Sequence, residues 1–585
     1  MTDATALPAA APPSEAAWLG RIGIARRQGN HLEAFDLARR ALKDWPDSMP
    51  CEHQAILALA RAGALEGAMQ RYNKLLAVGK LDNIPDTNLA ADFAGLSGRL
   101  FKDLAARHPE PAASQYRLAS AKAYEAGFER FGAYYLAINA ASLFLAAGYL
   151  DQALNYARIA HRAATNIPPD YWTNATQAEA SLILGNFADA CKSLAAASSF
   201  GAGNLDNLAT TRRQLSWVAA LVEAPADLLD HLPGPLVLNW SSGRIANYET
   251  VKFEFSVGPG VLAFGPLLSP SDLYLAKALL DAGTILQLLL PNAPDILAVQ
   301  SFSNGPELRA LFDHVLAHER TRQMRVTDQG APLEPAASLL CAKQARGLAL
   351  LRAQSLAVTP RLLVPGPDGP SYQPMPKDHS DLTDAAFEHD VPADRRRQSH
   401  AILFGDVHGF SALTEFQQLE FLEHIIGGFA DVLNNTPSAE YAETAGDGLF
   451  IVLSDLIEAV ECAFALHAVL PRGAAAGGLP PNLGMRISAH VGPLYKRLDR
   501  VINREKFCGM EVIRTARIEP VTPVGEIYVT EQFAAVLACA AGDAFACEYV
   551  GLQPMAKGYG ECRMYSLRRT MQGSLKRPHS RRNGP

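Results

Sequence analysis

The stretch AILFGDVHGFSALTE, residues 401–415, holds a carboxylate at the end of a hydrophobic strand. We expect Ala401–Phe404 to form this strand and to run into a turn that carries Asp406. The stretch YAETAGDGLFIVLS, residues 441–454, then places Asp447 in a β-hairpin. Side chains on paired strands lie about 4.5–5.5 Å apart at Cβ. That spacing suits two divalent cations roughly 3.5–4 Å apart, an arrangement that drives displacement at phosphorus.

Two further stretches follow these carboxylates. GMRISAHVGPLY, residues 484–495, predicts a strand followed by a Gly turn, and CGMEVIRTARIEPVTPVGEIYVTEQF, residues 508–533, predicts a turn, a helix, a Pro/Gly loop and a strand. Together the four motifs resemble the catalytic domain of class III adenylate and guanylate cyclases, over residues 399–568. The resemblance implies an α+β ferredoxin-like domain that makes a cyclic nucleotide.

Bulk properties limit what the rest of the chain can be. A length of 585 residues leaves room for two to four domains, and 49% hydrophobic with 19% charged residues describes a globular protein. The net charge of −7 argues against general nucleic-acid binding. No apolar run approaches the ~20 residues of a membrane span, and no signal peptide is recognisable. The eight cysteines are scattered singly, which predicts a reducing cytoplasm and neither a zinc site nor a disulfide framework.

The N-terminal part predicts an all-α solenoid. After an Ala/Pro-rich leader over residues 1–14, residues 15–225 are Ala/Leu-rich and helical in pattern. In NHLEAFDLARRALKDWPDS, Ala34 and Ala38 are spaced to pack together and Pro46 ends a helix, as in one tetratricopeptide-like (TPR-like) unit. A similar unit follows, ALARAGALEGAMQRYNKLLAVG, as expected for a period of about 34 residues.

The next stretches of the same region carry a second resemblance. AYEAGFERFGAYYLAINAASLFLAAGYLDQALNYARIA, residues 123–160, again predicts a helix, a Gly turn and a helix. With GRLFKDLA upstream, it resembles the helical domain beside cyclase domains in some bacterial proteins, related to domains of kinases that bind TRAF adaptors. This implies a solenoid that binds a protein partner or regulates the chain; a scaffold that packs only on its own chain is the alternative.

The middle part, residues 230–364, predicts a small α/β Rossmann-like domain. GPLVLNW, GVLAFGP and TILQLLLP are buried-strand candidates, and SPSDLYLAKALLDAG is a helix with Ser271 or Asp272 near its N-cap. Gly-Pro turns could hold a nucleotide at a helix N-terminus. The lack of a GxGxxG or Walker motif favours a structural or sensory module. Residues 365–398 are rich in Pro and Asp and predict a linker.

The cyclase resemblance assigns roles in phosphate and metal binding. It implies that Asp406 and Asp447 hold two Mg²⁺ or Mn²⁺ ions per site and that the carbonyl of Val407 is a further ligand. The backbone amides of Val407 to Ser411, which include Gly409, Phe410 and Ser411, would cradle the phosphates as the chain enters a helix. The alternatives without a functional role are that Asp406 lies in an exposed turn, that Asp447 belongs to a simple GDG hairpin and that His408 is a turn residue. The helix that follows is predicted by the spacing of Leu422, Ile425, Ile426, Phe429, Val432 and Leu433.

One family position is altered in this chain. The resemblance makes Arg517 the group that stabilises transition-state charge, and the family places a ribose-orienting Asn four residues earlier, where this chain has Ile513. Losing one such hydrogen bond costs about 1–3 kcal/mol, or roughly one to two decades in rate. We therefore expect a slow enzyme, or one that uses another group in place of the Asn, rather than an inactive one. The alternative for Arg517 is a surface ion pair with Glu511 or Glu519.

Two positions are expected to read the base. The resemblance places Glu443 and Lys506 there; a Glu can accept hydrogen bonds from guanine and a Lys can donate to its O6, which favours GTP over ATP. Lys557 resembles a triphosphate-binding lysine, although it could equally cap a strand. Sites of this class form between two catalytic domains, so one such domain per chain implies a homodimer.

The predicted function is that of a soluble cytoplasmic nucleotide cyclase, regulated by its helical region and acting on GTP or ATP. It would contact neither nucleic acid nor a membrane. The alternative is a catalytically silent cyclase-like domain for dimerisation or nucleotide sensing. Residues 569–585 predict a basic tail.

Overall fold

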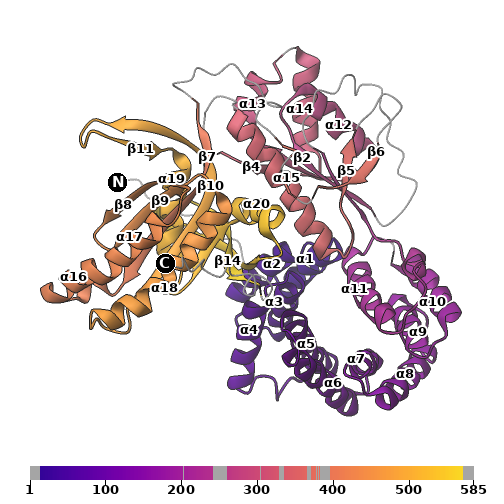
Figure 1. Cartoon of the computed structure of the whole chain (residues 1–585). Coiled ribbons are helices and arrows are strands. Elements are labelled where there is room, and N and C mark those ends of the chain that lie inside the picture. The colour runs from indigo at the N-terminus through magenta and orange to yellow at the C-terminus, as the bar shows by residue number, and fades with distance from the viewer. Residues whose placement is uncertain are drawn as a thin grey trace, which may run out of the picture. The chain divides into compact units, whose positions relative to one another are not determined.

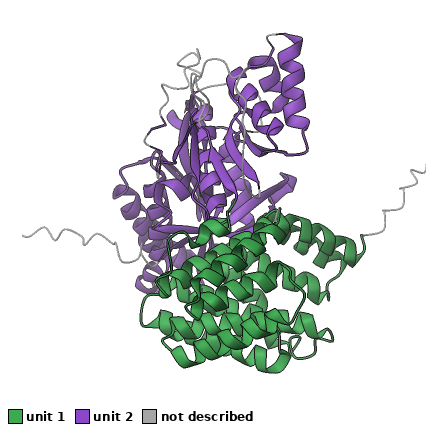
Figure 2. Cartoon of the chain, turned by 90° about the vertical axis from the view of Figure 1, so that its right-hand side faces the viewer, with its two compact units in different colours: residues 1–234, 355–357 green, residues 235–354, 358–585 purple. Residues whose placement is uncertain are grey.

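The computed structural model of the chain describes residues 13–570, apart from 202, 241–259, 304, 328–334, 365–370, 377, 380 and 383–395 (Figure 1). These residues form two compact units, one of residues up to 234 with 355–357 and one of the remaining residues from 235 onward (Figure 2). Most of the predicted leader and of the predicted basic tail lies outside the described residues. None of the described helices is long and apolar enough to cross a membrane.

The first unit is an array of helices in which chain neighbours from α1 to α10 pack against each other. The helices are α1 (Glu15–Arg27), α2 (His31–Asp44), α3 (Met49–Arg61), α4 (Leu65–Ala77), α5 (Thr87–Arg107), α6 (Ala112–Phe131), α7 (Tyr134–Ala146), α8 (Leu150–Thr165), α9 (Tyr171–Ile183), α10 (Phe187–Phe200) and α11 (Leu205–Leu221). Ala34 and Ala38 are fully buried, and Gly29 turns the chain between α1 and α2 with φ 64°. The predicted helical region is confirmed.

Helix α11 contacts α1, α7 and α9, which are distant from it along the chain. Asp206 in its first turn is 2% exposed and pairs with Arg26 of α1, whose Nη2 lies 3.3 Å from Asp206 Oδ2. Arg61 of α3 pairs with the same oxygen, and His31 Nε2 lies 3.7 Å from Asp206 Oδ1. One buried carboxylate therefore connects α11 to the first helices of the unit.

The second unit begins with a sheet of order β4-β3-β2-β1-β5-β6. Its strands are β1 (Leu236–Asn239), β2 (Val261–Pro266), β3 (Ile285–Leu290), β4 (Thr321–Arg325), β5 (Arg361–Val364) and β6 (Ser371–Pro374). All pair in parallel except β6, which is antiparallel to β5. The connecting helices are α12 (Pro270–Asp281), α13 (Pro294–Gln300), α14 (Pro306–Ala317) and α15 (Pro335–Ser355).

The N-cap of α12 is Ser269, and Ser271 and Asp272 lie near it, as expected. Pro270 fits the first helical position, and Asp272 closes a capping box onto Ser269. One prediction about this region is wrong. The stretch predicted as a linker contains β6, which completes the sheet edge, and its end contributes the first residue of the next strand, Gln398. The part of that linker over residues 383–395 lies outside the described residues.

The C-terminal sheet has the order β13-β14-β12-β10-β7-β9-β8, with β11 paired to β10. Its strands are β7 (Gln398–His408), β8 (Ala439–Ala445), β9 (Gly448–Leu453), β10 (Gly484–Asp499), β11 (Arg504–Cys508), β12 (Ile527–Thr530), β13 (Phe545–Pro554) and β14 (Glu561–Arg569). Its longer helices are α16 (Glu415–Phe421), α17 (Gly427–Asn434), α18 (Leu456–Ala476), α19 (Met510–Ile518) and α20 (Glu531–Ala541). The C-terminal α/β domain is confirmed.

The helix predicted after β7 is present, with one local change. A π-helical turn, η6 (Leu422–Ile426), joins α16 to α17. Ile425 and Phe429 are buried, as their spacing predicts, whereas Leu422 is 54% exposed. The apolar face of this segment is therefore wider than the domain's own core needs.

Candidate active site

Strand β7 brings Asp406 to the centre of the C-terminal sheet, between β10 and β9. The expected turn after Phe404 is wrong: the strand continues to His408, because Asp406 and His408 pair with Arg486 and Gly484 of β10. The chain turns only at Gly409, whose φ of 93° favours glycine. Asp406 therefore projects from a paired strand, which fixes its backbone more firmly than a turn would. For the same reason the amides of Val407 and His408 belong to a paired strand rather than to a helix entrance.

Asp447 occupies the predicted hairpin turn. Ala445 pairs with Gly448 across β8 and β9, so Gly446 and Asp447 form the connection. On its other edge β9 pairs with β7 up to the Gly405–Leu449 pair, which places this turn beside Asp406. Burial raises the pKa of Asp447, and the negative charge of Asp406 raises it further. The two predicted carboxylates thus lie within electrostatic range of each other.

Arg486, to which the sequence motifs gave no role, lies close to Asp406. Arg486 Nη2 is 2.7 Å from Asp406 Oδ2, and Arg486 Nε is 2.5 Å from Glu519 Oε1. The only sequence signal was a basic residue within the GMRIS strand, because its alignment with Asp406 depends on long-range strand pairing. Arg486 neutralises part of the negative charge at this end of the sheet.

The residues present fit divalent cations that a substrate helps to bind. Among the described residues, no group of three or more His, Cys, Asp or Glu side chains is arranged to hold a metal ion alone. Mg²⁺ is usually bound by one or two protein carboxylates together with substrate phosphates and waters. Asp406 and Asp447 supply the two carboxylates of that donor set. The negative charge of Asp406 raises the pKa of Asp447, so a cation between the two would relieve an unfavourable interaction.

The segment after Gly409 is held by its own side chains. Phe410 begins a short 3₁₀ turn, η5 (Phe410–Ala412), and its ring lies 4.8 Å from that of Phe421 at the end of α16. Ser411 is exposed. Helix α16 starts later, at a capping box of Thr414 and Gln417. Any phosphate cradle in this loop would therefore use amides that precede the helix.

Helix α19 carries Arg517 and Ile513 four residues apart. Ile513 is 40% exposed, and Arg517 is half-buried. The two acids that could pair with Arg517 are engaged elsewhere: Glu519 pairs with Arg486, and Glu511 Oε2 lies 2.8 Å from His490 Nε2. Arg517 itself makes no ion pair within the part of the chain that the structure describes, so its charge is available to a ligand.

Glu443 and Lys506 meet in one chain although they belong to β8 and β11. Lys506 Nζ donates to Glu443 Oε1 at 2.9 Å, and Tyr441 Oη donates to Glu443 Oε2 at 2.8 Å. The bond from Lys506 holds the pKa of Glu443 below its usual range. An acceptor and a donor thus lie side by side, as a base-reading pair requires.

Comparison with known protein families agrees with this geometry. The model described as adenylate and guanylate cyclase catalytic domain matches residues 393–569. Residues 393–569 belong to that family. A second model, described as tetratricopeptide repeats-sensor, matches residues 30–144. No curated protein matches the chain.

Solved cyclase structures resemble part of the chain. The adenylyl cyclase CyaB from P. aeruginosa is 17% identical, with 32% of this chain and 98% of that chain covered and a TM-score of 0.27. The guanylyl cyclase Cya2 is 23% identical over 29% of this chain and 92% of that chain, with a TM-score of 0.25. The guanylate cyclase domain of RhGC from Catenaria anguillulae, solved with GTP, is 18% identical. The match covers 29% of this chain and 97% of that chain, with a TM-score of 0.26.

Lys557 lies in the loop between β13 and β14 of the cyclase domain. It is exposed and sits in a short turn, η8 (Ala556–Gly558), with φ 59°. This turn packs against α19, the helix of Arg517. Lys557 therefore lies in a turn that contacts the helix of Arg517.

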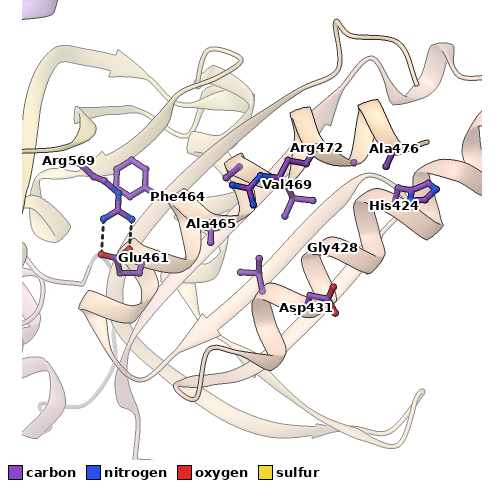
Figure 3. Close-up of a pocket in the computed structure, with 13 residues that line it drawn as sticks. His424, Gly428, Asp431, Glu461, Phe464, Ala465, Val469, Arg472, Ala476 and Arg569 are labelled. Atoms are coloured by element: carbon purple, nitrogen blue, oxygen red, sulfur yellow. Dashed lines mark hydrogen bonds and ion pairs between the residues drawn. The ribbon is translucent and has the colours of Figure 1, made fainter. Parts of the chain in front are cut away.

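The cyclase domain also has a cavity of about 760 Å³ on η6, α17 and α18 (Figure 3). None of the predicted metal, base or transition-state residues lines it. The cavity is thus a feature separate from the candidate active site.

Proposed function

We propose that the chain is a class III nucleotide cyclase, which converts a nucleoside triphosphate into a 3′,5′-cyclic nucleotide and pyrophosphate. The observation that carries the proposal is that Asp406, near the end of β7, lies beside the turn before β9 that holds Asp447. This pairing occurs inside a segment that matches the cyclase catalytic family. The ribose 3′-oxygen would lose its proton and bond to the α-phosphorus as the bond to pyrophosphate breaks.

Asp406 and Asp447, with the carbonyl of Val407, would hold two Mg²⁺ or Mn²⁺ ions. When bound, such ions supply positive charge to the attacking and leaving oxygens. The chain's own contribution is to hold the two carboxylates next to each other. Arg486 supports this by balancing the charge of Asp406 at 2.7 Å.

The phosphates would be bound by separate elements. The amides of Gly409, Phe410 and Ser411 would contact them from the metal side, since they follow β7 directly. Arg517 would stabilise the charge that develops at the transition state, because its guanidinium has no ion pair within the described residues. Lys557 would contact the triphosphate from the turn that packs on α19.

Glu443 and Lys506 would read the base. Guanine presents donors at N1 and N2 beside an acceptor at O6, which complements a Glu acceptor and a Lys donor. Their 2.9 Å hydrogen bond supports a single shared site for both. We therefore propose GTP as the preferred substrate and ATP as the weaker one.

The catalytic unit would be a homodimer with a two-fold axis. In that arrangement Asp406 and Asp447 of one chain face Glu443, Lys506 and Arg517 of the other. Exposed apolar side chains on the cyclase domain support such an association. Phe416 is 83% exposed, Leu419 is 61% exposed and Val501 is 93% exposed. Burying such side chains is the main driving force of association.

The N-terminal helices would regulate the cyclase or bind a protein partner, since residues 30–144 match a repeat-sensor model. The parallel sheet from β1 to β5 would be a Rossmann-like structural or sensory module. Asp272 supports a role without phosphate binding, because its carboxylate accepts hydrogen bonds from the amides of Leu268 and Ser269 at 2.9 and 3.0 Å. The negative charge of Asp272 lies at the N-terminus of α12, where an anion would otherwise bind.

A second candidate function is a catalytically silent domain for dimerisation or nucleotide sensing. The observation that favours it is Ile513, which stands at the ribose-orienting position and offers no hydrogen bond. Product analysis separates the two functions. The purified full chain is incubated with each of the four nucleoside triphosphates and Mg²⁺ or Mn²⁺, and the products are identified by mass spectrometry. Cyclic nucleotide supports the enzyme; nucleotide binding without product supports the silent domain.

A further inference from the structure

The 760 Å³ cavity is a groove between two helices of the cyclase domain. One side is η6 and α17, with Gly428, and the other is α18, with Ala465 and Ala468 (Figure 3). These residues are small, so the space that larger side chains would fill remains open. Phe464 and Val469 add apolar surface to the same groove. A groove of this kind accepts apolar side chains of an added segment.

The last described strand ends at this groove. Arg569 of β14 is one of its lining residues. The Arg569 guanidinium lies 4.6 Å from the centre of the Phe464 ring, and its Nη1 is 2.9 Å from Glu461 Oε1. Thr570, the next residue, is fixed by a hydrogen bond to the carbonyl of Ala544. The segment that follows, residues 571–585, therefore starts within one residue of the groove.

The sequence of that segment complements the end of the groove nearest Arg569. MQGSLKRPHSRRNGP contains Lys576, Arg577 and two further arginines but no Asp or Glu. The groove carries two acidic residues, Asp431 and Glu461, and two arginines, Arg472 and Arg569. Glu461 is paired with Arg569, whereas the Asp431 carboxylate makes no ion pair within the described residues. A basic segment can thus gain an ion pair at Asp431.

The segment is also long enough. Its residues can span at most about 50 Å when extended, and the groove runs along α18 from Glu461 to Ala476, a helical length of about 22 Å. Met571 and Leu575 supply apolar side chains near the start of the segment. Length, charge and starting point agree with one occupant.

We propose that residues 571–585 of the chain dock in the groove between α17 and α18, with Lys576 close to Asp431. This interaction surface lies on the helices that follow the Asp406 strand. A bound segment would contact the same helical stretch that leads away from the metal carboxylates. The proposal does not depend on which nucleotide the site uses.

Zero-length cross-linking of the full chain tests the docking. A carbodiimide joins a lysine to a carboxylate only when the two are in contact, and Lys576 is the single lysine of the segment. We expect a Lys576–Asp431 or Lys576–Glu461 link within one chain, identified by mass spectrometry. Links from Lys576 only to carboxylates outside α17 and α18 would overturn the proposal. So would links found only between isotopically light and heavy chains in a mixture, because they would mean that the segment docks on a second copy.

Two groove variants sharpen the result. Ala468→Arg fills the groove and should lower the yield of the link at least fivefold. Ala475→Arg is the matched control: it adds the same charge at an exposed alanine of α18 that does not line the groove, and it should leave the yield unchanged. Equal yields in both variants would contradict the proposal.

A charge exchange keeps the test valid if Ala468→Arg fails to fold. This experiment measures the rate of hydrogen exchange at the backbone amides of residues 427–434, which the docked segment should slow. In the double variant Lys576→Glu, Arg577→Glu this rate should be at least threefold higher than in the wild type. Adding Asp431→Lys to the double variant should restore the slower exchange. Failure of the exchange to restore protection would show that Asp431 does not receive the segment.

Discussion

Lys506 Nζ lies 2.9 Å from Glu443 Oε1, so the two side chains assigned to the base are paired with each other within one chain. The bond lowers the pKa of Glu443 and raises that of Lys506. Both groups therefore stay charged around neutral pH. A base that enters must replace this bond with two of its own, which makes the pair sensitive to the donor and acceptor pattern of the base.

The first prediction concerns this choice of base. Adenine would set its N1 acceptor against the Glu443 carboxylate, and such a mismatch costs about 1–3 kcal/mol. We expect at least a tenfold preference for GTP over ATP, and Glu443→Lys with Lys506→Asp should shift preference towards ATP. The measurement is kcat/KM for both nucleotides in the wild type and the double variant. A wild type that turns over ATP faster would refute the assignment of these two residues while leaving the cyclase assignment standing.

The second prediction concerns the carboxylates. Asp406→Asn or Asp447→Asn should remove cyclase activity, because one metal ligand is lost in each. The fold should stay nearly as stable, since replacing one carboxylate relieves its repulsion of the other. Glu423→Gln, at an exposed acid of η6, is the control and should keep its activity. Activity and Tm are measured on the same preparations; activity that survives in either Asp variant would exclude the two-metal assignment.

The third prediction is a pH dependence set by Asp447. Its pKa is raised by burial and by the charge of Asp406. A raised carboxyl pKa means that the fold favours the protonated form. The stabilising contribution is therefore complete below the unfolded pKa of about 3.9 and is lost as pH rises through the folded pKa.

In EDTA, we thus expect the Tm of the wild type to fall as the pH rises above about 4, and we expect Asp447→Asn to abolish this fall. Added Mn²⁺ should raise the Tm of the wild type at pH 7 but not that of the variant. Parallel Tm curves for the two proteins across this pH range would rule out a raised pKa at Asp447.

The sequence predicted what local patterns encode. Asp406 and Asp447 were found because a hydrophobic strand and a Gly-Asp-Gly hairpin are readable from adjacent residues. Arg486 was missed because its contact with Asp406 depends on how β10 aligns with β7, and no local pattern encodes that alignment. The roles assigned to these residues stay predictions.

Two strands of the middle sheet, β4 and β6, carry no local pattern that predicts them. β4 is a polar edge strand, Thr321–Arg325, and β6 ends in a proline, so neither shows an apolar run. Edge strands need little hydrophobic patterning because one side faces solvent. The start of α12 could be predicted only approximately, since Ser269, Ser271 and Asp272 are all suitable caps and only the position of Pro270 distinguishes them.

The fourth prediction tests the shared site. Asp406→Ala and Arg517→Ala chains should each be inactive alone. Mixing them should restore one working site per heterodimer, at up to a quarter of wild-type activity when subunits exchange randomly, because half the dimers are mixed and each carries one intact site of two. Subunit exchange is followed with differently tagged chains. Confirmed exchange without returning activity would show that each site is built from one chain.

The last prediction concerns the helical unit, where Asp206 is 2% exposed and pairs with Arg26, Arg61 and His31. Asp206→Asn keeps the shape of the side chain but leaves the buried Arg61 without its carboxylate. Breaking a buried pair by removing one partner costs about 3–5 kcal/mol. We expect the transition of the helical unit, followed by differential scanning calorimetry, to move to lower temperature by several degrees.

The matched control is Asp189→Asn, which removes an exposed carboxylate that pairs with Lys192 on the surface of α10. Exposed pairs contribute about 0–1 kcal/mol, so this variant should melt close to the wild type. Because the two variants make the same chemical change, the difference between their melting temperatures measures what the buried position of Asp206 and its three partners contribute. Equal transitions would mean that α11 is held by its apolar contacts and that Asp206 contributes little.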